Sequence, residues 1–503
     1  MKSFKIFIFL SLLIKVSNLP VQAQEYQEQI RALDEYIQEA IQLWKPPGLA
    51  VTVVKDQEVL FQKGYGTRLL GQDLPVNAHT LFVCASTTKA FTAAALAMLV
   101  DEGKVDWDDK VIDHLPHFRL SDPYITSELT VRDLLTHRSG MGNADFLWTF
   151  MDLSPDTILY KMRQLEPAYS LRAGYIYQNI MYLAAGEVVE RASGIPWGAF
   201  LKERIYDPLG MTETYAFKGQ TAGQDNKAEA HEWIKGEIIP IEQSEADSIG
   251  PAGSMWSSVS DMSKWIRFLL DSARINGQTL IQPSSYSELF KPQHLIPAQS
   301  FYPSRHLTRP HWTSYGLGWF QHDYRGKMVQ FHTGSLSGMV AILGMIPEEG
   351  IGVYIMANLD HVEIRHALMY AVFDLFLYGE ITRDWSKELK ALYDQGAAES
   401  AASKPKRIEN TTPAVEIDNN LGTYTSPIYG KVVLSEVNGT FRLNINDKLK
   451  GSLEHWNYDT YLVTFDKKTY GERFVTFSYS PSGKVKTLEL MGREFQYFLP
   501  GDK

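Results

Sequence analysis

Residues 82–89 read FVCASTTK and run into the alanine-rich segment 90–102, and this stretch decides the fold of the chain. Apolar side chains recur there at the spacing of a helix with a buried face, at Phe91, Ala94, Ala95, Met98 and Leu99. Gly103 stands where the helix is expected to end. Ser86 falls at the N-terminus of this predicted helix, and Lys89 follows one turn later on the same face.

A serine at a helix N-terminus is well placed for nucleophilic chemistry. Its backbone N–H is free of the helical hydrogen-bond ladder, and the helix dipole favours an oxyanion nearby. A lysine amine one turn away can accept the hydroxyl proton once its pKa is lowered by burial or a cation. The same pattern also suits a serine that caps a core helix, and it recurs at Ser403 and Lys406. The downstream sequence decides between these readings.

Residues 1–23 have the features of a secretory signal peptide. Lys2 and Lys5 precede an apolar run over residues 6–14, and residues 21–23 (VQA) supply small side chains for cleavage. The apolar run is too short to span a membrane. We therefore expect an exported protein, periplasmic or secreted, with no stable membrane insertion.

Net charge and cysteine content restrict the function classes. The formal net charge is −10, and it becomes −13 without the three lysines of residues 1–23. Such an acidic chain argues against nucleic acid as a partner. Cys84 is the only cysteine, so no intramolecular disulfide can form and the fold depends on its hydrophobic core. The length favours one large domain with a smaller one.

Hydrophobic periodicity predicts an α/β fold, in which an antiparallel sheet is flanked by helices and carries a helical lobe. Helices are expected over residues 26–43, 130–137, 178–192, 197–206, 260–270 and 362–377. Strands are expected over residues 49–54, 59–61, 315–320, 327–332, 340–346 and 352–357. The early hairpin and the late strands are expected to share one sheet, with the helical middle inserted between them. This main domain is predicted to span residues 24–394.

The composition changes after residue 394. Residues 395–416 are rich in Ala, Ser, Lys, Pro and Thr without apolar periodicity, which is typical of a linker. Alternation of apolar and polar residues resumes over 417–503, and Asn438-Gly439 is expected to form a hairpin turn. The tail is therefore predicted to be a separate all-β unit, a small lipocalin-like β-barrel.

Two further motifs carry groups that suit hydrolytic chemistry. One contains Tyr177 and Asn179, and the other, residues 331–335 (FHTGS), ends a predicted strand. A phenol acts as a base only near a cation, because its ordinary pKa is far above neutral. Lys89 and a protonated His332 are the candidate cations. A strand that ends in Thr-Gly also brings main-chain N–H groups close to a bound carbonyl.

Taken together, Ser86-x-x-Lys89, Tyr177-x-Asn179 and residues 332–334 (HTG) resemble the serine β-lactamase-like hydrolases in order and separation. That superfamily includes class C β-lactamases, D-alanyl-D-alanine carboxypeptidases, D-aminopeptidases and carboxylesterases. Further stretches are similar to family segments, at residues 130–140, 207–211, 251–254 and 315–319. The resemblance covers about residues 30–380 and implies an α/β sandwich with a mainly helical lobe.

The resemblance also implies how the chemistry is shared. Ser86 would attack an amide or ester carbonyl and form an acyl-enzyme without a cofactor. Lys89 and Tyr177 would share the roles of general base and proton donor. The backbone N–H groups of Ser86 and Ser335 would form the oxyanion hole, and Asn179 would orient the acyl side chain of the substrate.

The third motif departs from one branch of the family. Class C β-lactamases carry lysine where this chain has His332, so the motif resembles that of the D-peptidases and some esterases. His332 would bind the substrate carboxylate or stabilise Tyr177, with Thr333 beside it in the binding site. Nothing in the sequence identifies a dedicated group that activates water for fast deacylation.

We therefore expect an exported serine hydrolase, a peptidase of D-aminopeptidase or carboxypeptidase type that acts on a small-molecule or peptide substrate. The alternatives are a carboxylesterase, a weak β-lactamase, and a non-catalytic penicillin-binding or sensing protein. C-terminal barrels in this superfamily shape access to the cleft or help subunits associate, so a homo-oligomer is one expected arrangement.

The histidines show no metal-binding pattern. His361 and His366 are five residues apart and share no helical face. His114, His117 and His137 are expected to be structural or to lie on the surface. No metal ion and no cofactor are therefore expected.

Overall fold

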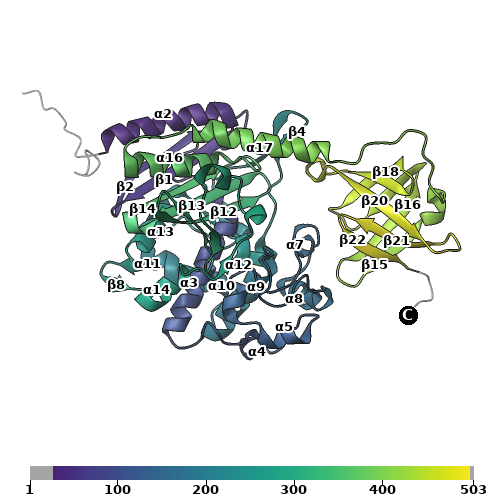
Figure 1. Cartoon of the computed structure of the whole chain (residues 1–503), viewed down its shortest axis with the longest axis horizontal. Helices are drawn as coiled ribbons and strands as arrows, with labels where there is room; N and C mark the ends of the chain where they lie inside the picture. The colour runs from purple at the N-terminus through teal and green to yellow at the C-terminus, as the bar shows by residue number, and fades with distance from the viewer. Residues whose placement is uncertain (1–25, 499–503) are drawn as a thin grey trace, which may run out of the picture.

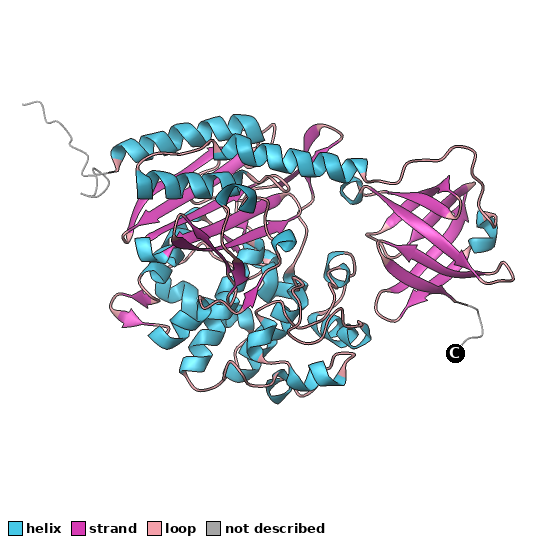
Figure 2. Ribbon diagram, in the orientation of Figure 1, coloured by secondary structure: helices cyan, strands magenta, loops and turns pink. Residues whose placement is uncertain are grey.

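A computed structural model describes residues 26–498 of the chain, and the predicted signal peptide lies outside the described residues. A large antiparallel sheet with helices on both faces forms the main body, and a closed β-barrel follows near the C-terminus (Figures 1 and 2). The predicted fold class, an α/β sandwich with a β-barrel tail, is confirmed.

The main sheet has eight strands in the order β2-β1-β14-β13-β12-β11-β10-β9, each antiparallel to its neighbours. The early hairpin joins the late strands through β1 and β14, where Val53 lies opposite Val353. The predicted sharing of one sheet is therefore confirmed. The strands are β1 (Gly48–Lys55), β2 (Glu58–Gly66), β9 (His294–Leu295), β10 (Thr313–Tyr315), β11 (Phe320–Tyr324), β12 (Lys327–Leu336), β13 (Met339–Ile346) and β14 (Ile351–Ala357).

Helices cover both faces of this sheet, which explains why β13 and β14 are buried along their whole length. On one face α2 (Gln27–Trp44) and α17 (Trp385–Ala402) pack against α16 (Ile364–Tyr378), which contacts β13 and β14. On the other face α13 (Val259–Leu270) contacts β1 and β14. Alternate side chains of β1 accordingly enter two separate hydrophobic cores.

The helical lobe is built around α3 (Thr88–Asp101), and every residue of α3 from Thr88 to Leu99 is buried. Small alanine side chains let α9 (Asn179–Ser193) and α12 (Gly250–Gly253) pack closely against it. The remaining lobe helices are α4 (Val111–His114), α5 (Pro123–Glu128), α6 (Val131–Leu134), α7 (Phe146–Thr149), α8 (Pro155–Lys161), α10 (Trp197–Leu201), α11 (Asp207–Leu209) and α14 (Pro283–Leu289). The short α15 (Arg305–Thr308) instead packs with the core on the α16 face of the sheet. Two small antiparallel sheets pair β3 (Phe82–Val83) with the distant β6 (Trp256–Ser257), and β4 (Ala230–Ile234) with β5 (Glu237–Ile241) in a hairpin.

Two predicted elements differ from the structure because residues with positive φ interrupt them. The single strand expected over 315–320 is a tight hairpin, in which Tyr315 lies opposite Phe320 and Gly318 has a φ of 85°. The helix expected over 130–137 is limited to α6, and His137 adopts a φ of 59°. Both positions lie in the left-handed region, which neither a strand nor a right-handed helix can include.

The C-terminal barrel closes through eight antiparallel strands, and the predicted turn at Asn438 and Gly439 joins two of them with positive φ at both residues. The predicted linker differs at its start, because α17 continues to Ala402. Four alanines after residue 396 favour the helix. The barrel strands are β15 (Gly422–Ser426), β16 (Gly430–Val437), β17 (Thr440–Asn444), β18 (Lys450–Asn457), β19 (Thr460–Phe465), β20 (Glu472–Tyr479), β21 (Val485–Leu490) and β22 (Arg493–Tyr497).

The barrel contacts the helical lobe near α7. The rings of Phe150 and Tyr470 meet edge to face with their centres 5.4 Å apart. An ion pair joins Lys467 of the barrel to Glu242, with 2.9 Å between nitrogen and oxygen. The tail therefore packs beside the lobe through both apolar and charged contacts.

Candidate active site

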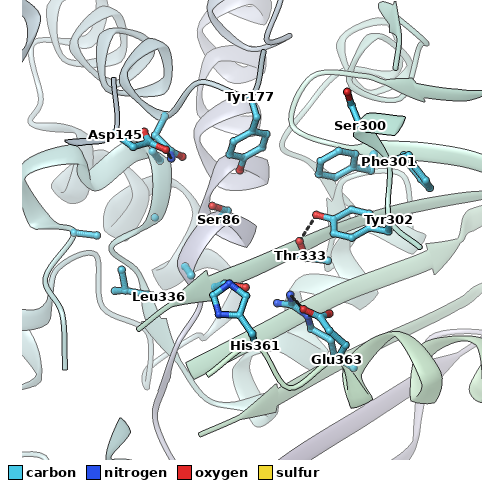
Figure 3. A pocket seen from close by; sticks show the side chains of 18 of the residues that line it. Ser86, Asp145, Tyr177, Ser300, Phe301, Tyr302, Thr333, Leu336, His361 and Glu363 are labelled. Atoms are coloured by element: carbon cyan, nitrogen blue, oxygen red, sulfur yellow. Dashed lines mark hydrogen bonds and ion pairs between the residues drawn. The ribbon is translucent and has the colours of Figure 1, made fainter. Parts of the chain in front are cut away.

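A cavity of about 580 Å³ opens between the sheet and the helical lobe, and Ser86 lines it (Figure 3). Ser86 belongs to a 3₁₀ turn, Ala85–Thr87, that continues directly into α3. Ala85 has a φ of 46°, a left-handed conformation that is costly for a residue with a Cβ atom. Such backbone strain is common at functional sites, and here it lies beside the candidate nucleophile.

Lys89 is fully buried, and its side-chain nitrogen has three hydrogen-bond partners. Nζ lies 3.1 Å from Ser86 Oγ, 2.7 Å from Asn179 Oδ1 and 2.8 Å from the backbone oxygen of Ala252. Burial lowers the pKa of Lys89 to about 7, and the Asp145 carboxylate acts in the opposite direction. Lys89 is therefore poised to lose its proton near neutral pH, as a general base for Ser86 must.

Tyr177 lies beside the same pair. Figure 3 shows its hydroxyl end pointing toward Ser86, and Lys89 Nζ is 4.9 Å from the centre of its ring. Burial raises the pKa of Tyr177 well above its ordinary value, while a hydrogen bond with Ser86 acts in the opposite direction. Tyr177 therefore keeps its proton at neutral pH, which suits a proton donor.

Asn179, the first residue of α9, lies between Lys89 and a carboxylate that the sequence did not indicate. Its Nδ2 atom is 3.1 Å from each oxygen of Asp145. Asp145 also accepts hydrogen bonds from Trp148 Nε1 at 2.8 Å and from Asn143 Nδ2 at 3.0 Å. A continuous chain of hydrogen bonds thus runs from Ser86 through the lysine and the asparagine to Asp145.

Strand β12 brings the third motif beside the Ser86 turn. A Cβ atom on Gly334 would lie 2.2 Å from the backbone oxygen of Cys84 and 3.1 Å from the backbone nitrogen of Ser86. Glycine is therefore required for the strand to approach this closely. Thr333 and Ser335 on either side both line the cavity. The oxyanion hole expected from the N–H groups of Ser86 and Ser335 requires such a close approach of strand and turn, which the structure shows at the neighbouring Gly334.

His332 differs from the expectation that it would act as a cation in the binding site. It is buried and does not line the cavity. Its Nε2 atom is 2.8 Å from the Tyr315 hydroxyl, and its Nδ1 atom is 2.6 Å from the backbone oxygen of Thr333. Burial and the charge of Lys89 lower the pKa of His332 to about 3. The imidazole is therefore neutral, with both nitrogens satisfied inside the protein.

The sheet side of the cavity holds a buried charge cluster. Arg365 binds Glu363 through two hydrogen bonds, with distances of 3.0 and 2.9 Å. It also donates to the backbone oxygens of Gly334 and Ala341 on β12 and β13. Burial alone would raise the pKa of Glu363, but Arg365 and His366 hold that pKa well below its ordinary value. This cluster anchors the strand that runs beside Ser86.

A second groove adjoins the cavity and reaches the barrel. Trp148, Ser335, Leu336 and His361 line both spaces. The far side of the groove is formed by barrel residues, namely Lys448, Lys467, Thr469 and Tyr470. A substrate too long for the cavity would therefore meet the barrel.

Sequence reasoning missed two residues next to the predicted ones. His137 was expected to be structural or on the surface, and it is a buried residue whose Nδ1 atom accepts from the backbone N–H of Gln178; the sequence did not indicate that its ring lies 4.2 Å from that of Tyr177. Asp145 carries no recognisable motif, and no sequence spacing connects it with Ser86. Only the fold brings these residues together.

Across residues 26–498, no group of three or more His, Cys, Asp or Glu side chains is arranged to hold a metal ion. Within the same range, no helix combines the length and apolar character that a membrane span requires.

Comparisons with known sequences agree with this geometry. The family model described as Beta-lactamase matches residues 33–374. A second model, described as a domain of unknown function (DUF3471), matches residues 406–499. Unguisins hydrolase ungD of Aspergillus violaceofuscus is 32% identical over 393 residues, which cover 73% of this chain and 68% of that protein. Protein flp of Staphylococcus aureus is 24% identical and covers 65% of this chain and 62% of its own length.

Solved structures share the fold. The octameric penicillin-binding protein homologue from Pyrococcus abyssi has a TM-score of 0.62 at 22% identity, covering 93% of this chain and 99% of its own. A D-stereospecific amidohydrolase from Streptomyces sp. has a TM-score of 0.56 at 22% identity, covering 71% and 99%. The extent of the family match, together with the 32% identical hydrolase, shows that this chain belongs to the beta-lactamase family and is a serine hydrolase.

Proposed function

We propose that the protein hydrolyses amide bonds through an acyl-enzyme on Ser86, as a peptidase of D-aminopeptidase or carboxypeptidase type. The observation that carries the proposal is the contact between Lys89 Nζ and Ser86 Oγ at 3.1 Å, made by a lysine whose pKa burial lowers to about 7. A buried amine that is partly neutral at physiological pH can activate a serine hydroxyl.

Acylation begins as Ser86 Oγ attacks the substrate carbonyl carbon while its proton passes to the neutral amine of Lys89. The carbonyl oxygen becomes an oxyanion, which the backbone N–H groups of Ser86 and Ser335 stabilise. Tyr177 gives its hydroxyl proton to the leaving amine as the carbon–nitrogen bond breaks. The Lys89 ammonium then returns a proton to Tyr177. The acyl group remains on Ser86 as an ester.

Deacylation repeats these steps with water as the nucleophile. Water attacks the ester carbonyl and loses a proton to the neutral Lys89, and the proton finally returns to Ser86 Oγ when the acid product leaves. The same groups thus serve both halves of the cycle, and no further residue is assigned to water activation.

The name of one structural neighbour, an amidohydrolase, supports an amide rather than an ester as the substrate. One relative is named as a hydrolase of unguisins, and one structural neighbour is named as a D-stereospecific amidohydrolase. We propose a substrate of the same kind for this chain, with a D-configured residue next to the scissile bond. Residues 1–23 favour a periplasmic or secreted location.

The test is a matched panel of D-alanine p-nitroanilide, L-alanine p-nitroanilide and p-nitrophenyl acetate. We expect the D-anilide to be cleaved with at least tenfold higher kcat/KM than the L-anilide, and the Ser86→Ala variant to cleave neither. Cleavage of the ester alone would show that the protein is a carboxylesterase and not a peptidase. Equal rates on both anilides would remove the proposed stereochemical preference.

A further inference from the structure

One carboxylate beside the active site has no role in the steps described above. Asp145 lines the cavity, and its oxygens accept hydrogen bonds from the side chains of Asn179, Trp148 and Asn143. Among the described residues it forms no ion pair with lysine or arginine within 4 Å. All its donors are therefore neutral N–H groups, although a cationic Lys89 lies one residue further along the chain of hydrogen bonds.

Asp145 fixes the orientation of the Asn179 amide. A carboxylate can only accept hydrogen bonds, so the NH₂ group of the amide must face Asp145. The amide oxygen then faces Lys89, as the 2.7 Å contact from Nζ to Oδ1 shows. With the amide turned around, its NH₂ group would face the lysine instead.

This orientation matters because a neutral amine has two N–H groups and one lone pair. The oxygens of Asn179 and Ala252 can accept the two N–H groups of Lys89. The third direction, toward Ser86 Oγ at 3.1 Å, is then left for the lone pair. A reversed amide would donate to that lone pair and compete with the serine hydroxyl.

We infer that Asp145 is a positioning residue, which holds the Asn179 amide so that the free lone pair of Lys89 points at Ser86. The inference rests on the proposed role of Lys89 as the base. It adds a fourth member to the Ser86–Lys89–Asn179 chain of hydrogen bonds, one that acts on the base without touching the reacting atoms.

Asp145 also supplies a negative charge near the base. The other titratable groups around Lys89 are Tyr177, Tyr182, His137 and His332. Burial raises the pKa of both tyrosines and lowers the pKa of both histidines, so these four are neutral near pH 7. Asp145 opposes the effect of burial on the pKa of Lys89. Removal of its charge must therefore lower the pKa of that lysine further.

The experiment measures the rate at which a fluorophosphonate reporter labels Ser86 between pH 5 and 10, in the wild type and in Asp145→Asn. In the wild type, labelling should increase as the pH rises through about 7, because Lys89 loses its proton there. In Asp145→Asn the maximal labelling rate should fall at least tenfold. The midpoint of the rise should also move to lower pH by at least half a unit.

Three further variants make the result specific. Asp145→Glu keeps the charge, so its midpoint should stay near that of the wild type even if its rate falls. Asp145→Ser gives the same readout as Asp145→Asn with a smaller side chain, should the latter be unstable. Asp271→Asn removes a carboxylate that pairs with Arg274 on the surface and should change neither quantity.

An unchanged midpoint in both neutral variants at Asp145, with normal melting temperatures, would overturn the inference. A wild type whose labelling shows no rise near pH 7, or a Ser86→Ala variant that still labels, would instead contradict the proposed function. The two failures are therefore distinguishable.

Discussion

Two polar networks border the cavity on opposite sides of Ser86. They differ in whether the buried charged group has an oppositely charged partner. On the lobe side, Lys89 is buried among neutral acceptors, and its pKa falls to about 7. On the sheet side, Arg365 and Glu363 are equally buried but fully paired, so both stay charged. The first network can exchange a proton near neutral pH. The second keeps β12 in place and takes no part in proton transfer.

The largest effect on activity should come from removing the general base, Lys89, from the lobe network. Lys89→Met has a similar shape but no amine, so we expect kcat/KM to fall by about 10²- to 10⁴-fold, the range of a general base. Initial rates on the D-anilide measure the loss. Lys104→Met, which removes an exposed lysine paired with Glu102, is the control and should retain wild-type rates. If the Lys89→Met enzyme kept more than a tenth of wild-type activity, the general base would have to be a residue other than Lys89.

Breaking the sheet network should instead reduce stability. Arg365→Met leaves the Glu363 carboxylate buried without its arginine partner and with only His366 beside it, so we expect the free energy of unfolding to fall by about 3–5 kcal/mol. Urea denaturation of the purified protein measures this loss. The double variant Arg365→Met, Glu363→Gln removes the stranded charge and should recover part of the stability. Equal losses in the single and double variants would show that the charge itself is not responsible.

A third substitution asks whether His332 belongs to the titrating network. Its pKa of about 3 means that it is neutral throughout the range from pH 5 to 9. The variant His332→Gln should therefore keep the same pH profile for labelling of Ser86, even if the maximal rate is lower. A wild-type rate that declines as the pH rises between 5 and 9, with no such decline in His332→Gln, would restore the cationic role inferred from the sequence.

The smallest effect on the chemistry should come from outside both networks, at the barrel. Tyr470→Ala removes a contact with Phe150 and opens the groove next to the cavity. We expect labelling by the small fluorophosphonate to stay within twofold of the wild type, and KM for a D-configured hexapeptide to rise several-fold. Equal changes for the small reporter and the peptide would mean that the barrel affects the cavity itself.

The sequence predicted most of the fold. One-sided burial leaves a clear apolar period in segments such as α2 and β16, and fully buried segments such as α3 and β13 are continuous apolar runs. It failed where a single backbone conformation decides, as at Gly318, where an expected strand turns back on itself. Four alanines likewise extended α17 into a segment that lacked any apolar period. Local sequence patterns predict which face of a helix or strand is buried better than they predict where the element ends.

For the site, Ser86, Lys89, Tyr177 and Asn179 could be proposed because they stand in short motifs at the starts of helices. Asp145 could not, because its relation to Lys89 exists only in three dimensions. His332 was proposed with the wrong charge, since its motif says nothing about burial or about the Tyr315 hydroxyl. A motif indicates which group is present, whereas the fold decides its protonation.

The central claim is that Ser86 forms a covalent acyl-enzyme with Lys89 as its base. The most direct measurement is mass spectrometry of protein treated with the fluorophosphonate reporter at pH 6 and pH 8, followed by peptide mapping. The account predicts one adduct, on the peptide that contains Ser86, which forms faster at pH 8 and is absent from Ser86→Ala. An adduct on another residue, or equal labelling of the Ser86→Ala protein, would contradict it.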